Sequence, residues 1–260
     1  MRLRTGLIFV CSTGLVFCTT AQAQRRDDKR LPQDSLSELA KDVKTLVEQQ
    51  RQMIDQLNEL KRLLPPAAAR PIAPPFDLSI QGERFRGDDA ARVAIVEYAD
   101  FECPYCGQYE HDIYPQISKD YVQAGKVKYF FRDLPSPMHP HAVGAARAAR
   151  CAGEQGKYWE MHDILFAKPN ALRDVDMPDH AQELGLDTAK FSECLSSDRY
   201  SDELKQSATE AQKMGIAGTP TFFIGKVGSN GEVSNLKAIL GARPYETFKS
   251  AIDAALAAAP

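Results

Sequence analysis

The motif Cys103-Pro104-Tyr105-Cys106 separates a short apolar run from a segment with helical periodicity. The apolar run predicts a strand, so the cysteines are expected between the end of a strand and the start of a helix. A thiol at the first turn of a helix meets unpaired N–H groups and the positive end of the helix dipole, and both favour a thiolate. The sequence therefore predicts a redox pair in which Cys103 is the exposed, acidified nucleophile and Cys106 is the shielded, resolving thiol.

Two other uses of the motif are weaker. A zinc site needs further ligands, and the chain has no second C-x-x-C. A purely structural disulfide between cysteines this close would close almost no loop and would stabilise the fold little. Pro104 suits the first helical position, where its missing N–H costs no hydrogen bond. Redox chemistry is the best explanation of the motif.

The C-terminal part of the chain alternates between strand and helix patterns. Strands are expected at 93–98, 126–132, 221–224 and 236–240. Helices are expected at 104–123, within an alanine-rich tract at about 139–213, and at 244–258. This order predicts an α/β domain with an inserted helical region.

Together with the downstream motif Gly-Thr-Pro-Thr-Phe-Phe at 218–223, the strand–CxxC–helix unit resembles the thioredoxin fold of the DsbA-like disulfide oxidoreductases. The resemblance covers residues 76–260. It implies that Pro220 follows a cis peptide bond and packs beside the cysteines. It also implies that the Thr219 backbone pairs with a bound substrate strand.

The same resemblance assigns roles to residues around the cysteines. Pro104 and Tyr105 join Thr219 and Pro220 as expected substrate contacts. DsbA itself has histidine where this chain has Tyr105; because histidine there can stabilise the thiolate, a weaker oxidant is expected. Tyr105, Thr219 and an N-terminal stalk resemble the multimeric ScsC-like proteins, several of which act as isomerases or reductases.

Two acids match the family by offset. Glu97 stands six residues before Cys103, where thioredoxin-like proteins place a buried carboxylate. Such an acid could take the proton of the resolving thiol Cys106, so Glu97 is expected to be catalytic. Glu110 stands seven residues after Cys103, as in DsbA itself, and is either part of the site or a solvated helix charge.

The N-terminus has the pattern of an export signal. Arg2 and Arg4 precede an apolar stretch, and Ala-Gln-Ala at 21–23 fits a cleavage site, so residues 1–23 are expected to be a signal peptide. A lipoprotein signal ending at Cys18 is the alternative. The expected location is the bacterial periplasm.

Cys151 and Cys194 are the other two cysteines beyond the signal and lie within the predicted helical insertion. In a compartment that permits disulfides, a structural disulfide between them is expected. Two buried free thiols, or a second redox relay, are the alternatives.

Residues 31–64 are expected to form a coiled-coil stalk, followed by a semi-rigid proline-rich linker at 65–75. The apolar residues of the stalk segment recur with heptad spacing and form a stripe along one side of the predicted helix. Val47 and Ile54 widen this stripe, which weakly favours a trimer. A single amphipathic helix folded back on its own domain is the alternative. The two seam positions are occupied by Leu36, Val43, Gln50, Leu57 and Leu64, and by Leu39, Leu46, Met53 and Leu60.

These features predict an exported protein thiol:disulfide oxidoreductase that acts on client proteins as an isomerase or reductase, because several active sites around one stalk can hold one client. It would need a membrane reductant. The alternatives are a DsbA-type dithiol oxidase with a reoxidising partner, an oligomeric protein that binds Cu(I) or Zn(II), and a stalked chaperone. The chemistry needs no cofactor or resident metal, and a net charge of −3 gives no reason to expect nucleic acid.

Overall fold

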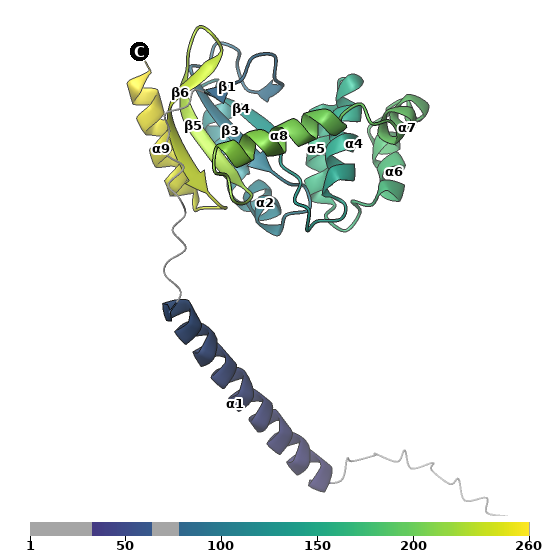
Figure 1. Cartoon of the computed structure of the whole chain (residues 1–260), viewed down its shortest axis with the longest axis vertical. Helices are drawn as coiled ribbons and strands as arrows, with labels where there is room; N and C mark the ends of the chain where they lie inside the picture. The colour runs from purple at the N-terminus through teal and green to yellow at the C-terminus, as the bar shows by residue number, and fades with distance from the viewer. Residues whose placement is uncertain (1–32, 64–77, 260) are drawn as a thin grey trace, which may run out of the picture. The chain divides into compact units, whose positions relative to one another are not determined.

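The computed structural model describes residues 33–63 and 78–259, which belong to two separate units (Figure 1). The expected signal peptide at 1–23 and the linker at 65–75 lie outside the described residues. Within the two described ranges, no helix combines the length and the apolar character needed to cross a membrane.

The described residues of the first unit form one helix, α1 (Gln33–Leu63). Every side chain described in α1 is exposed. Four residues of the predicted seam, and the two residues that widen its apolar stripe, are more than half exposed. They are Leu39, Val43, Leu46, Val47, Met53 and Ile54. Heptad spacing places these residues along one side of the helix, so among the described residues of its own unit α1 has an unpartnered apolar stripe.

The second unit is built on a six-stranded sheet with the order β1-β6-β5-β3-β4-β2. Strands β3 and β4 are parallel and the other neighbours are antiparallel. The four expected strands are present, whereas β1 and β2 have two residues each, too few to show a periodic pattern. The strands are β1 (Leu78–Ser79), β2 (Phe85–Arg86), β3 (Val93–Ala99), β4 (Val127–Asp133), β5 (Thr221–Val227) and β6 (Glu232–Leu240).

Helices cover both faces of this sheet and form the insertion (Figure 1). The helix expected at 104–123 is one continuous helical segment in which two π-helical turns, at Tyr109–Ile113 and Ser118–Val122, interrupt the α-helix. The α-helices are α2 (Pro104–Gln108), α3 (Tyr114–Ile117), α4 (Ala142–Glu154), α5 (Tyr158–Ala167), α6 (Met177–Glu183), α7 (Thr188–Ser196), α8 (Ser201–Lys213) and α9 (Tyr245–Ala258).

Strand β3 lies at the centre of the sheet and is buried on both faces. Because side chains alternate along a strand, Val93, Ile95 and Glu97 share one face. Val93 and Ile95 pack there with Tyr129 of β4 and with Phe248 of α9. Glu97 is therefore a carboxyl group in the middle of an apolar layer.

The apolar residues of the insertion pack in one cluster with Phe101, Cys103 and Cys106, and a disulfide between Cys151 of α4 and Cys194 of α7 crosslinks the insertion. The bond spans 43 positions in the sequence. A loop of that length gives about 3–4 kcal/mol of stabilisation on the chain-entropy account.

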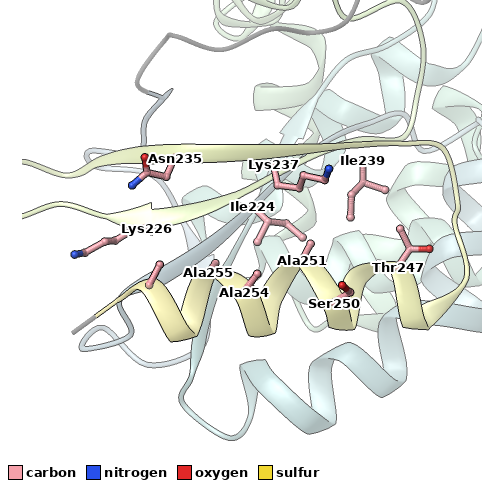
Figure 2. Close-up of a pocket in the computed structure, with 11 residues that line it drawn as sticks. Ile224, Lys226, Asn235, Lys237, Ile239, Thr247, Ser250, Ala251, Ala254 and Ala255 are labelled. Carbon is pink, nitrogen blue, oxygen red and sulfur yellow. The ribbon is translucent and has the colours of Figure 1, made fainter.

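The alanines of α9 leave a groove between this helix and strands β5 and β6 (Figure 2). Ala251, Ala254 and Ala255 face Ile224 and Lys237 across it. The groove has a volume of about 530 Å³ because alanine is too short to fill the space above the sheet. None of the site residues expected from the sequence lines it.

Candidate active site

The two motif cysteines lie where the sequence places them, at the junction of β3 and α2. Cys103 is the N-cap of α2, with extended backbone, and Pro104 occupies the first helical turn. The N–H groups of Cys106 and Gly107 donate to the Cys103 carbonyl at 3.1 and 3.0 Å. These bonds fix the Cys103 backbone at the start of the helix, where the dipole argument places it.

The Thr219–Pro220 peptide bond is cis and brings a distant loop to the cysteines. The Cys103 sulfur lies 3.5 Å from the carbonyl oxygen of Thr219. Pro220 is buried at the start of β5. The fold thus unites the two motifs on which the family resemblance rests.

Cys103 is less exposed than the sequence suggested. Only 6% of the residue is accessible, because the Thr219 backbone lies against its sulfur, and Cys106 is fully buried. The next two positions behave differently, since Pro104 and Tyr105 are both exposed. The surface offered to another protein at this point is therefore made chiefly by Pro104 and Tyr105, with the sulfur just behind it.

The two thiols have opposite acidities. A hydrogen bond from the Cys106 thiol, helped by the Thr219 side chain and by the N–H groups of Cys106 and Tyr105, lowers the pKa of Cys103 to about 5. Burial raises the pKa of Cys106 far above its ordinary value, and its bond to Cys103 and the nearby Glu97 charge act in the same direction. At neutral pH Cys103 is a thiolate and Cys106 remains a thiol.

Glu97 lies beneath the cysteines and is fully buried. The Tyr129 hydroxyl donates to Glu97 Oε2, whereas Glu97 Oε1 has no hydrogen-bond partner among the described residues. Burial and then the charge of Glu110 raise the pKa of Glu97 well above its ordinary value. Glu97 therefore keeps its proton to a higher pH than a carboxyl group in water does.

Glu110 belongs to the site and is not a solvated helix charge. Its side chain is 7% exposed, and its Oε1 lies 3.2 Å from the Tyr129 hydroxyl. Burial raises the pKa of Glu110 to about 8, although the Arg86 guanidinium acts against this shift. Tyr129 thus stands between two buried carboxyl groups.

Asp100 is a structural member of the site that sequence reasoning missed. Its carboxylate accepts from the N–H groups of Glu102 and Ser136 at 2.8 Å and contacts His139 Nδ1 at 2.7 Å. Its carbonyl accepts from the Cys103 N–H at 3.1 Å. Asp100 therefore fixes the loop from which α2 begins. An acid just before a helix was the only signal that could have indicated it.

Among residues 33–63 and 78–259, no group of three or more His, Cys, Asp or Glu side chains is arranged to hold a metal ion. Cys151 and Cys194 form their own disulfide in the insertion, apart from the Cys103–Cys106 pair.

The fold and the two-cysteine site define the class of protein. A family profile described as thioredoxin matches residues 79–254, and the chain belongs to that family. Within it, the domain at 78–259 is a DsbA-like thiol:disulfide oxidoreductase.

Relatives and solved structures support this placement. Disulfide bond formation protein D of Bacillus subtilis is 29% identical over 186 residues, which cover 67% of this chain and 78% of that protein. The crystal structure of BdbD from Bacillus subtilis matches with a TM-score of 0.59 at 26% identity, covering 70% of this chain and 96% of that one. The α-DsbA1 structure from Wolbachia pipientis, at 23% identity, has a TM-score of 0.62 over 70% of this chain and 94% of that one, and shares the fold.

Relatives with another name match only in part. The Na(+)/H(+) antiporter NhaA 3 of Salinispora tropica is 43% identical over 143 residues, which are 55% of this chain. The chain spans only about a fifth of that protein, 21% of its length. The likeness is therefore confined to one part of a much longer protein.

Proposed function

We propose that the chain is an exported enzyme that exchanges disulfides with client proteins through Cys103 and Cys106. The observation that carries this proposal is the opposite acidity of two adjacent thiols, one beside the Thr219 carbonyl and the other above Glu97. The Cys103 thiolate attacks a client disulfide, one client sulfur leaves as a thiolate, and a mixed disulfide remains. Cys106 then gives its proton to Glu97 and attacks the Cys103 sulfur, which releases the second client thiolate.

The direction that we propose is isomerisation or reduction. The unpartnered apolar stripe of α1 supports assembly of several copies through residues 36–64, with a trimer favoured. Several sites held together can retain one misfolded client through repeated exchanges. The enzyme must return to the reduced form, so its partner would be a membrane reductant, and its location would be the periplasm.

A second candidate direction is dithiol oxidation. Stabilisation of the Cys103 thiolate stabilises the reduced enzyme, and this makes the Cys103–Cys106 disulfide a stronger oxidant. The name of the Bacillus subtilis relative, a disulfide bond formation protein, favours the same direction. This reaction would require a partner that reoxidises the enzyme.

Reactivation of a substrate with scrambled disulfides tests the direction. The full mature chain is compared with a version that starts at Phe76, and Cys103→Ser is the inactive control. Reactivation by the full chain alone supports an isomerase that depends on α1. If neither version reactivates the substrate but both oxidise a reduced one, the enzyme is an oxidase.

The metal-binding alternative is tested separately. Thiolates of Cys103 and Cys106 from several copies could hold Cu(I) or Zn(II) together. Stoichiometric metal in the reduced oligomer that disappears in Cys103→Ser would favour this alternative. Metal content that does not depend on Cys103 would count against it.

A further inference from the structure

The resolving step leaves a proton in the interior of the protein. Cys106 and Glu97 are both fully buried, so neither side chain exchanges protons with water directly. Each turnover in which Cys106 forms the disulfide with Cys103 deposits one proton on Glu97. The next such turnover requires that Glu97 lose this proton. Other side chains must therefore connect Glu97 with solvent.

Tyr129 provides the first connection. Its hydroxyl contacts Glu97 Oε2 on one side and lies 3.2 Å from Glu110 Oε1 on the other. A tyrosine hydroxyl carries one proton and also accepts, so it can donate to one carboxylate while it accepts from the protonated other. Moving both protons one step along this chain transfers a net proton from Glu97 to Glu110 without moving a heavy atom.

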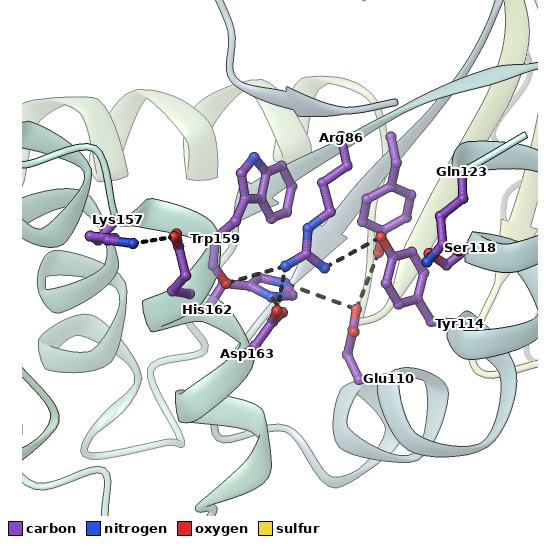
Figure 3. Close-up of polar contacts among 11 residues, drawn as sticks. Arg86, Glu110, Tyr114, Ser118, Gln123, Lys157, Trp159, His162 and Asp163 are labelled. Carbon is purple, nitrogen blue, oxygen red and sulfur yellow. Dashed lines mark hydrogen bonds and ion pairs between the residues drawn. The ribbon is translucent and has the colours of Figure 1, made fainter. Parts of the chain in front are cut away.

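Glu110 lies next to a polar cluster of His162, Asp163 and Arg86 (Figure 3). Its Oε1 is 3.9 Å from His162 Nε2, and His162 Nδ1 is 2.9 Å from Asp163. Arg86 donates to Asp163 at 2.5 Å and to the Trp159 carbonyl at 3.2 Å. The Asp163 side chain is 55% exposed.

A polar hollow of about 610 Å³ opens at this cluster. Arg86 and Asp163 line it together with Ser118 and Gln123. Ser118 follows directly on α3, so the hollow lies beside the end of that helix. Neither Cys103 nor Thr219 lines the hollow, whereas Arg86 and Asp163, which do, are the charged groups that act on Glu110.

We infer that Glu97, Tyr129 and Glu110 form a proton relay that connects Cys106 with the polar hollow at Arg86 and Asp163. The inference rests on the proposed thiol–disulfide exchange. Glu110 first loses its proton to water in the hollow. The Tyr129 proton then moves to Glu110 and the Glu97 proton moves to Tyr129. The Glu97 carboxylate takes the Cys106 proton as that sulfur bonds to Cys103, so one proton leaves for each disulfide formed.

The charges around the relay explain why Glu110 loses its proton before Glu97 does. The groups that face Glu97 are Glu110, Tyr129, Tyr109, Cys103 and Cys106, and none of them is a cation. Glu110 has the Arg86 guanidinium on its outer side, along with Asp163 and His162. Negative charge is therefore more stable on the outer carboxyl than on the inner one, so solvent removes the proton from Glu110.

The test separates the two chemical steps in the full mature enzyme. The reduced enzyme is mixed with a fluorescent peptide that contains one disulfide, and formation and release of the mixed disulfide are followed between pH 6 and pH 9. Tyr129→Phe should slow release on the order of tenfold and leave formation unchanged, because only release uses Cys106. Tyr114→Phe is the matched control: it removes a neighbouring hydroxyl that contacts Arg86 but not Glu97, and it should change neither step.

Glu110→Gln supplies a readout that a merely structural role would not move. In the natural chain the release rate should rise with pH up to about 8, as Glu110 loses its proton. The variant should lose this rise and should be slowed as much as Tyr129→Phe. The double variant should be no slower than either single variant, because both block the same route.

Three results would overturn the relay. They are release by Tyr129→Phe within twofold of the natural rate, a pH dependence that survives in Glu110→Gln, and additive losses in the double variant. If Tyr129→Phe does not fold, Glu110→Gln still carries the test through its pH dependence. If the natural enzyme forms no mixed disulfide at all, the proposed function fails, and that result is distinct from any failure of the relay.

Discussion

The carbonyl oxygen of Thr219 lies 3.5 Å from the Cys103 sulfur, although the two residues are 116 positions apart in the chain. This contact places the backbone of the loop before β5 beside the atom that bonds to the client. A client segment that approaches Cys103 therefore meets the backbone of Thr219 at the same point, which is the geometry of strand addition.

Cys106→Ser should trap the enzyme on its clients. Without the Cys106 thiol the mixed disulfide at Cys103 cannot be resolved from within the enzyme. Non-reducing electrophoresis of cells that express the variant should show adducts that disappear on reduction. Cys103→Ser should show none, and adducts of equal abundance in both variants would contradict the assignment of Cys103 as nucleophile.

The reactivity of Cys103 should depend on pH in a range unusual for a thiol. Because its pKa is lowered to about 5, alkylation of the reduced enzyme by iodoacetamide should reach half its maximal rate near pH 5 and be constant above pH 7. Alkylation in a Cys106→Ala variant should titrate at higher pH, since the largest cause of the lowered pKa is the Cys106 hydrogen bond and alanine has no donor to replace it. A midpoint near pH 8 in the natural chain would show that the cap does not stabilise the thiolate.

Glu97→Gln should lower the activity of the enzyme and raise its stability at alkaline pH. The pKa of Glu97 is raised in the folded enzyme. Its contribution to stability is therefore lost as pH rises from the pKa of a glutamate in the unfolded chain, about 4.3, towards the pKa of Glu97 in the folded enzyme. The variant should therefore match the natural chain at pH 4, unfold a few °C higher at pH 8, and resolve mixed disulfides more slowly. Glu246→Gln, which changes an exposed acid of α9, is the control and should do neither.

Removing the insertion disulfide should affect stability alone. The double variant Cys151→Ala/Cys194→Ala should lose about 3–4 kcal/mol of unfolding free energy in urea, as expected for the loop that this disulfide closes. Exchange rates measured at 20 °C should stay within twofold of the natural chain. A folded double variant that no longer exchanges disulfides would instead indicate a second redox relay.

Assembly through α1 can be tested at one seam position. Leu46→Glu places a charge in the apolar stripe and should convert the oligomer to monomers in sedimentation velocity. Lys44→Glu reverses a charge at an exposed position beside the stripe and should leave the assembly intact. Equal effects of both variants would show that net charge, and not the seam, governs association.

Much of the site could be predicted because its signals are local. The position of Cys103 at a helix start follows from the motif and its flanking patterns, and Glu97 follows from a fixed offset on the preceding strand. Tyr129 could not be found in this way. It reaches Glu97 only because β3 and β4 are adjacent and parallel, and their pairing register depends on the whole sheet.

The direction of the Glu110 side chain was undecided in the sequence for a different reason. Helical periodicity treats 104–123 as a regular α-helix, but Glu110 lies in the π-helical turn Tyr109–Ile113. One extra residue in a turn changes the direction of the side chains that follow, and hydropathy does not reveal it. The same limit applies to β1 and β2, whose pairing is decided by the strands beside them.

Cys103 and Cys106 belong to the same buried cluster as the insertion residues Ala149, Met161 and Phe166. Converting the two thiols to a disulfide therefore changes atoms inside a packed core. By thermodynamic linkage, any difference in folding free energy between the oxidised and reduced forms appears in full in the reduction potential. Repacking the insertion is thus a means of tuning how strongly this enzyme accepts electrons.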